Sequence, residues 1–145
     1  MKGKELLEIE AKEREQAKRR AKFTLRYTAI QVTDLDRALS FYLDILGMRL
    51  VTRIKVPETK GELAIVKSEG AEHWLEINWY ADQEYESGNE LDHIAFQVED
   101  LDEALSELKQ KGVEPISYAR ESKNSRWTYV ADPDGIWIEI FQKKD

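Results

Sequence analysis

The sequence predicts an α+β fold in which two βαβββ modules, related by a pseudo-twofold axis, curve their sheets around a cavity, with an added N-terminal helix. Two observations predict this fold. The 145 residues are 41% hydrophobic and include no cysteine, as in a globular domain that needs no disulfide. The nine residues that begin at Val32 are repeated with seven identities by the nine that begin at Val98, so the chain is a duplicated half-domain.

A second repeat, Trp74-Leu-Glu-Ile77 against Trp137-Ile-Glu-Ile140, indicates that the halves share their whole order of elements. Expected strands cover residues 25–32, 49–56, 62–68 and 73–79 in the first half, and 92–98, 114–119, 126–131 and 136–141 in the second. Expected helices run from the cap Asp34 to near Gly47, along an apolar stripe of Leu35, Ala38, Leu39, Tyr42 and Leu46, and from Asp100 to Lys111 before Gly112. The turn Asp132-Pro-Asp-Gly135 joins the last two strands.

These elements predict a charged N-terminal helix in residues 1–23 and one domain in residues 24–142. That domain divides into a module at 24–80, a polar linker at 81–90 and a module at 91–142. No apolar stretch approaches the roughly 18 residues of a membrane span or the 7 to 15 of a signal-peptide core, so we expect a cytoplasmic protein that does not bind membranes.

Charge is distributed unevenly along the chain. Residues 1–22 carry 8 basic and 5 acidic side chains, whereas the remainder carries 14 basic and 24 acidic side chains. The acidic body disfavours nucleic-acid binding. The first segment reads as a basic arm for nucleic acid or membrane, or as a solvated helix docked by its first turns on a partner subunit. The second reading is favoured by the i,i+4 pairs Glu8/Lys12, Glu10/Arg14 and Glu15/Arg19 and by the few large apolar residues, Leu6, Leu7 and Ile9.

Strand alternation predicts which side chains share the face away from the helices. They are Tyr27, Ala29, Gln31, Trp74, Glu76 and Asn78 in the first half, and His93, Ala95, Gln97, Trp137, Glu139 and Phe141 in the second. Tyr27 and His93 are repeat mates, as are Glu76 and Glu139. If the two sheets face each other, these four meet near the axis, where two carboxylates and an imidazole favour a divalent cation. The alternative is that the glutamates are solvated and His93 is a hydrogen-bonded core residue. His73 is out of register with Glu76, so it faces the apolar side or solvent, and it receives no role.

The chain resembles the vicinal oxygen chelate superfamily over residues 24–142. This superfamily includes glyoxalase I, extradiol dioxygenases, methylmalonyl-CoA epimerase and the fosfomycin- and bleomycin-resistance proteins. The matching motifs are Val32-Thr-Asp-Leu-Asp with Phe41-Tyr42 and Leu46-Gly47-Met48, then Asp92-His93-Ile-Ala, and Asp132-Pro-Asp-Gly135 followed by Ile138-Glu139.

The resemblance implies that the four derived positions are the metal-ligand positions, and it separates the subfamilies. Glyoxalase I is similar at Glu76, His93 and Glu139, but has His or Gln where this chain has Tyr27, and an arginine that anchors the glutathione carboxylate where this chain has Gln31. The extradiol dioxygenases and fosfomycin enzymes need a histidine at the Tyr27 position. The epimerases usually have glutamine in place of Glu76, and bleomycin-binding members use no metal. Tyr27 is therefore either a phenolate ligand or a neighbour of a metal-bound water.

The resemblance favours a metal-dependent, glyoxalase-I-like lyase or isomerase that acts on a small enolisable 2-oxo carbonyl compound. Zn, Ni, Co, Mn and Fe(II) all suit the donors. Glu139 takes the role of base that the resemblance gives to its position, and Glu76 could share it. Trp74, Trp137, Gln31 and Gln97 are expected to line the substrate pocket, although the tryptophans also fit a core role. Small members of the superfamily commonly pair, so we expect a homodimer. A ring-cleaving dioxygenase and a metal-free drug-binding or resistance protein remain the alternatives.

Overall fold

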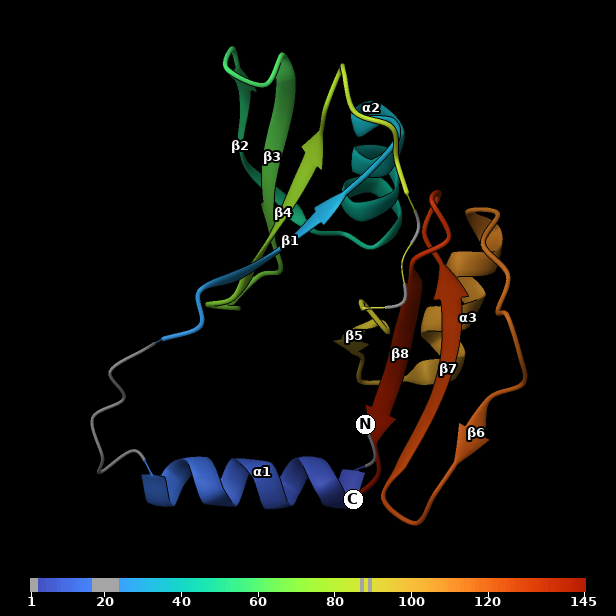
Figure 1. The fold of residues 1–145 in the computed structure, drawn as a ribbon. Coiled ribbons are helices and arrows are strands. Elements are labelled where there is room, and N and C mark those ends of the chain that lie inside the picture. Colours follow the sequence, from blue (N-terminus) through green and yellow to red (C-terminus); the bar gives the residue numbers. More distant parts are fainter. Residues whose placement is uncertain (1–2, 17–23, 87, 89) are drawn as a thin grey trace. The chain divides into compact units, whose positions relative to one another are not determined.

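The computed structural model describes residues 3–16, 24–86, 88 and 90–145 (Figure 1), and the chain divides into two compact units. The first is the N-terminal module, Thr24–Leu91. The second groups the C-terminal module, Asp92–Asp145, with the N-terminal segment that contains helix α1 (Gly3–Gln16). The expected helix at residues 1–23 is confirmed over that range, and residues 17–23 lie outside the described part of the chain. No helix in the described residues is long and apolar enough to cross a membrane.

The N-terminal module has the predicted order of elements. They are β1 (Tyr27–Gln31), α2 (Leu35–Leu39), the π-helix η1 (Ser40–Ile45), β2 (Arg49–Val56), β3 (Gly61–Lys67) and β4 (Trp74–Trp79). The sheet order is β1-β4-β3-β2, in which β1 and β4 are parallel and the other pairs are antiparallel. Ile30, Val32 and Ile77 are buried. Because side chains alternate along a strand, this burial defines the helix-covered face of the sheet.

The C-terminal module repeats the arrangement. Its elements are β5 (Ile94–Gln97), α3 (Leu101–Gln110), β6 (Arg120–Glu121), β7 (Ser125–Ala131) and β8 (Trp137–Lys143). The sheet order is β5-β8-β7-β6, again with the first pair parallel. Ile138 and Ile140 are buried on the helix side. The duplication inferred from sequence is therefore present in both topology and strand direction.

The local signals at the helix ends operate as predicted. The carboxylate of Asp34 accepts the Arg37 amide at 3.0 Å, and the carboxylate of its repeat mate Asp100 accepts the Glu103 amide at 3.1 Å. Gly47 and Gly112 follow the two helices with positive φ angles of 77° and 84°, a conformation in which a side chain would be strained. The repeat therefore extends to how each helix begins and ends.

The Asp132 turn is also confirmed. The Asp132 carboxylate accepts the amides of Asp134 and Ile136, each at 2.9 Å, and Gly135 takes a φ of 89°. The buried carboxylate thus fixes the turn that leads into β8.

The predicted strand at residues 114–119 is wrong. That stretch is irregular, and the sheet edge is instead the short strand Arg120–Glu121. Pro115 has no amide hydrogen to give to a ladder. The segment still follows β7, since the Ile116 amide donates to the Tyr129 carbonyl at 2.8 Å and the Thr128 hydroxyl donates to the Ser117 carbonyl at 3.1 Å.

The first helix also departs from the predicted regular α-helix. After Leu39 it widens into the π-helix η1, where the Leu46 amide donates to the Phe41 carbonyl at 3.0 Å. The adjacent residues Phe41 and Tyr42 are both buried. A π-helix has more residues per turn than an α-helix, so consecutive side chains are separated by a smaller rotation about the helix axis. The rings of Phe41 and Tyr42 can therefore both be buried on one side of the helix.

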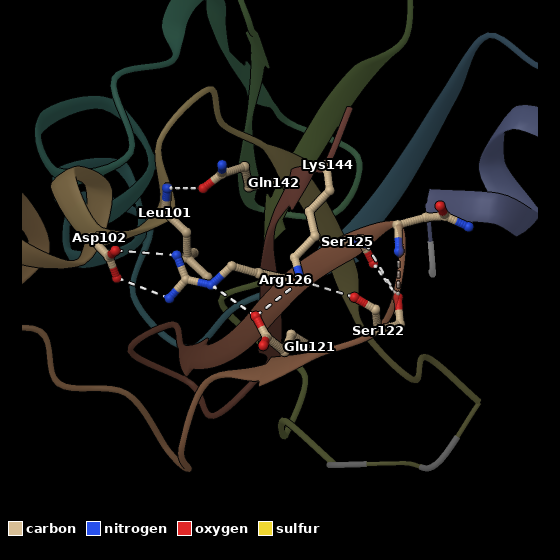
Figure 2. Close-up of polar contacts among 9 residues, drawn as sticks. Leu101, Asp102, Glu121, Ser122, Ser125, Arg126, Gln142 and Lys144 are labelled. Atoms are coloured by element: carbon tan, nitrogen blue, oxygen red, sulfur yellow. Dashed lines mark hydrogen bonds and ion pairs between the residues drawn. The ribbon is translucent and has the colours of Figure 1, made fainter.

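Figure 2 shows how charged side chains tie the start of α3 to the sheet edge in the C-terminal module. Arg126 donates to both carboxylate oxygens of Asp102 at 3.0 and 3.1 Å, and its Nε lies 3.7 Å from Glu121. Lys144 lies 3.0 Å from the same Glu121 carboxylate. The hydrogen bonds from Arg126 and Lys144 hold the pKa values of Asp102 and Glu121, respectively, below their ordinary values.

The N-terminal module builds the equivalent tie with reversed charges on its strands. Arg53 on β2 donates to Asp36, the repeat mate of Asp102, at 2.7 Å and to Glu62 on β3 at 2.9 Å. In the C-terminal module the arginine is on the inner strand and the glutamate on the edge strand. Both arrangements fix the first turn of the helix over its sheet.

Deleting residues 1–22 is expected to leave secondary structure and metal affinity largely intact. Helix α1 leaves Leu7 and Ile9 53% and 41% exposed, and its ion pair from Glu10 to Lys143, at 2.9 Å, is of a kind worth about 0–1 kcal/mol at a surface. Circular dichroism and a metal titration of the shortened chain test this. A shortened chain that fails to fold would show that α1 is structural.

Candidate active site

In the C-terminal module, His93 and Glu139 meet on the sheet face away from α3. His93 immediately precedes β5, and Glu139 lies in the middle of β8 opposite Ala95. The imidazole Nε2 is 3.5 Å from the Glu139 Oε2 atom. The Glu139 side chain has no exposed surface, whereas that of His93 is 28% exposed. Burial of a carboxylate is costly unless the group is paired or hydrogen-bonded.

The other side of the His93 ring is also engaged. Its Nδ1 atom lies 2.6 Å from the Asp92 carboxylate. The ring meets that of Tyr129 edge-on, with centroids 5.6 Å apart, and Tyr129 in turn packs on Trp137 at 5.2 Å. Burial, followed by the negative charges of Glu139 and Asp92, raises the pKa of Tyr129 above its ordinary value. The phenol is therefore neutral at physiological pH.

Tyr129 is a site residue that the sequence reasoning missed. It lies on β7 directly opposite Glu139, so it shares the face of that carboxylate. The signal that could have found it is the antiparallel register across the Asp132 turn, which fixes the partner of each β8 residue.

In the N-terminal module, the equivalent positions hold a different arrangement. Tyr27 is opposite Trp74 in the parallel pair, and the two rings stack with centroids 5.2 Å apart and planes 10° apart. Glu76 is half-buried and its Oε2 accepts the Asn78 amide at 3.1 Å. Tyr27 is 45% exposed. The guanidinium of Arg26 lies 5.8 Å from the Trp74 ring centroid, within cation–π range.

The register agrees with the predicted faces. Tyr27, Trp74 and Glu76 alternate with residues buried on the helix side of the sheet, and the stack shows that the first two share a face. On the other face, the Thr28 hydroxyl is 2.9 Å from Nε2 of His73. His73 is exposed and contacts Thr28 there.

The expected pocket residues occupy these same faces. Trp74 is half-buried and Trp137 is 47% exposed. Gln31 pairs in register with Asn78, and Gln97 pairs with Phe141, so each glutamine lies two residues beyond the alanine opposite its module's glutamate. They therefore remain candidates for contacts with a substrate near those glutamates.

A surface hollow of about 270 Å³ occurs elsewhere, at the start of α2, and Arg53, Glu62 and Trp79 are among its lining residues. Trp79 alternates with the candidate face of β4, so the hollow is on the helix side of the sheet. Glu62 is already paired with Arg53. This hollow does not include the candidate donors.

The structure brings together two of the four predicted donors, His93 and Glu139, and places Tyr27 and Glu76 in the other unit. In the described residues, no three His, Cys, Asp or Glu side chains cluster as a metal site. The C-terminal pair nevertheless fits a cation. An imidazole nitrogen and a carboxylate oxygen face each other at 3.5 Å, and the second imidazole nitrogen is held by a carboxylate, as is usual for metal-binding histidines.

Comparison with known proteins agrees with this geometry. The sequence profile of the Glyoxalase/Bleomycin resistance protein/Dioxygenase superfamily matches residues 24–140, which include every candidate donor. The chain belongs to this superfamily. The family assignment covers both repeats, so it confirms the resemblance seen in the motifs.

Alignments of the chain with its curated relatives cover nearly the whole length of those relatives. A probable lactoylglutathione lyase of Synechocystis is 38% identical over 130 residues, covering 83% of this chain and 98% of the relative. The lactoylglutathione lyase of Shigella flexneri is 36% identical over 127 residues, covering 83% and 93%. The solved structure of the trypanothione-dependent glyoxalase I of Leishmania major has a TM-score of 0.70 and 33% identity, covering 83% and 86%. Within the superfamily, these relatives support glyoxalase-I-like activity and do not favour the ring-cleaving or drug-binding alternatives.

Proposed function

We propose that this protein is a metal-dependent, glyoxalase-I-like lyase that converts the adduct of a small 2-oxo aldehyde and a thiol into a 2-hydroxyacyl thioester. The observation that carries the proposal is the fully buried Glu139 carboxylate facing His93, in a chain that matches lactoylglutathione lyases over 83% of its length. Glu76, His93 and Glu139 would hold the cation, with Tyr27 beside it. One nitrogen and two carboxylates suit Zn, Ni, Co, Mn or Fe(II).

The reaction moves one carbon-bound proton. Glu139 takes the proton from the carbon that carries sulfur and returns it to the neighbouring carbon, while the hydroxyl proton passes between the two oxygens. No oxidant or reductant is consumed. A divalent cation held by Glu76, His93 and Glu139 would supply Lewis acidity and would stabilise the negative charge that develops on the substrate. The burial of Glu139 excludes the water that would compete for the proton.

The surrounding side chains position the substrate. Trp137 presents an aromatic surface that is 47% exposed next to the His93 neighbour Tyr129, and Trp74 presents another with its Tyr27 stack. Gln31 is neutral, so it cannot form an ion pair with a carboxylate group of a thiol such as glutathione. The relatives' names include both glutathione and trypanothione, so both thiols are used in the assay.

The assembly and location follow from the same proposal. We expect a homodimer, because small members of this superfamily commonly pair. Sedimentation showing a monomer at micromolar concentration would contradict this expectation. We expect the protein to work in the cytoplasm, where small thiols are kept reduced.

The direct test of function combines metal content with product formation. Protein purified without chelators or affinity-column metals is analysed for bound metal, then assayed with methylglyoxal and glutathione, trypanothione or no thiol, following the thioester by absorbance. We expect metal to be bound and thioester to form with at least one thiol. A metal-free protein that forms no thioester with any thiol, even after metal is added, would overturn the proposal.

Replacing Tyr27 by histidine is expected to tighten metal binding by about tenfold or more, because it adds a nitrogen donor at the repeat mate of His93, and even indirect partners of a metal change its affinity about 10- to 100-fold. Competition with a chromophoric chelator measures the change. The matched control is Tyr27→Phe, which keeps the stack on Trp74 and removes only the hydroxyl. Unchanged affinity in Tyr27→His would show that Tyr27 does not adjoin the metal.

A further inference from the structure

Asp92 makes a short hydrogen bond to His93, and this bond favours a proton on one of the two imidazole nitrogens. Its carboxylate oxygen lies 2.6 Å from Nδ1 of His93. An ionised carboxylate only accepts hydrogen bonds, so this contact favours a proton on Nδ1. In the neutral ring this leaves Nε2 unprotonated, and that atom is the one that lies 3.5 Å from Glu139.

The two tautomers of His93 give this pair opposite properties. With the proton on Nδ1, the Nε2 lone pair and the Glu139 oxygen face each other as two electron-pair donors, which suits a cation. With the proton on Nε2, the ring would donate to the Glu139 carboxylate, and Nε2 would have no lone pair for a cation. The contact from Asp92 therefore favours the tautomer in which Nε2 can bind a metal over the one in which Nε2 donates a hydrogen bond to Glu139.

Two features indicate that this selection is built into the C-terminal module. Tyr129 packs edge-on against the His93 ring. This contact favours the ring orientation in which Nδ1 faces Asp92. The repeat mate of Asp92 is Arg26, which precedes Tyr27 and lies over the Trp74 ring instead. A carboxylate thus precedes His93 in the C-terminal module, whereas an arginine precedes its repeat mate Tyr27 in the N-terminal module.

We propose that Asp92 is a positioning residue that holds His93 in its Nδ1-protonated tautomer and so keeps Nε2 available to a divalent cation. The role of the cation rests on the proposed function, but the tautomer does not. Asp92 is 91% exposed, so replacing it creates no cavity.

The tautomer can be read directly in the metal-free, full-length protein. The chain has two histidines, so a two-bond ¹H–¹⁵N correlation spectrum of ¹⁵N-histidine-labelled protein contains two imidazoles. At mildly alkaline pH, His93 is expected as the Nδ1-protonated tautomer, because its Nδ1 lies 2.6 Å from the Asp92 carboxylate. Asp92→Ala should shift it to the Nε2-protonated tautomer, and Asp92→Asn, whose amide oxygen still accepts, should restore the original pattern. His73 is the internal control and should not change.

Zn²⁺ affinity, measured by chelator competition, provides the second readout. Asp92→Ala should weaken it about 10- to 100-fold, and the matched control Glu99→Ala, which removes an exposed negative charge away from His93, should not. A wild-type His93 in the Nε2-protonated tautomer, or an Asp92→Ala spectrum identical to wild type, would overturn the proposal. Absence of thioester with every thiol would overturn the proposed function and leave the tautomer result standing, so the two failures are distinguishable.

Discussion

Replacing Glu139 by glutamine is expected to lower kcat by about 10²- to 10⁴-fold, the usual contribution of a positioned acid or base. Glutamine has nearly the same volume, so the fully buried site remains filled. Its amide oxygen can still approach a cation, but an amide cannot take up the substrate proton at neutral pH. The fall in turnover should therefore exceed the fall in bound metal.

The matched variant is Glu76→Gln, for which we expect the opposite balance. Glu76 is half-buried and holds the Asn78 amide at 3.1 Å, and its proposed task is to bind metal. The glutamine should lose metal affinity and retain more of the turnover per bound metal. The measurement is kcat with metal content per subunit determined on the same samples.

Two results would contradict these roles. If Glu139→Gln lost metal in proportion to its activity, Glu139 would be a ligand and not a base. If Glu76→Gln lost turnover while fully loaded with metal, the base role would belong to Glu76 or be shared by the two carboxylates.

Elements set by local chemistry could be predicted from the sequence. Asp34 and Asp100 cap their helices through bonds that span three residues, and Gly47 and Gly112 end them through their own backbone conformation. Such signals require no knowledge of distant parts of the chain. The repeat then doubled each signal, since one half served as a check on the other.

Elements set by packing or by a missing donor were harder to predict. A 3.6-residue period cannot reveal the π-helix that contains the buried Phe41 and Tyr42, because that period assumes a regular α-helix. The strand expected near Ile116 has suitable residue types, but Pro115 interrupts its hydrogen bonding. In the first case packing overrides a local pattern, whereas in the second a single proline overrides the β-propensity of its neighbours.

The candidate site divides in the same way. Alternation along single strands placed Glu76 and Glu139 on the correct faces. Tyr129 depended on the register between two strands, and the role of Asp92 depended on the direction of a side chain that precedes a strand. Neither property is contained in periodicity, and for that reason the residues around His93 emerged only from the structure.

Replacing His93 by alanine is expected to abolish binding of Zn, Ni and Co, because His93 supplies the only nitrogen donor in the proposed set of ligands. Carboxylates alone favour harder cations such as Mg and Mn, so the loss should be greatest for the metals that prefer imidazole. The fold should persist, because His93 immediately precedes β5 and its side chain is 28% exposed. His93 is therefore not part of the core.

The control is His73→Ala, which removes the other imidazole of the chain together with its contact to the Thr28 hydroxyl at 2.9 Å. His73 lies on the opposite face of its sheet from Glu76, so this variant should bind metal as wild type does. Metal per subunit after dialysis, with circular dichroism to confirm folding, separates the two variants. Stoichiometric Zn or Ni in folded His93→Ala, or its loss in His73→Ala, would place the metal at a site other than the one formed by Glu76, His93 and Glu139.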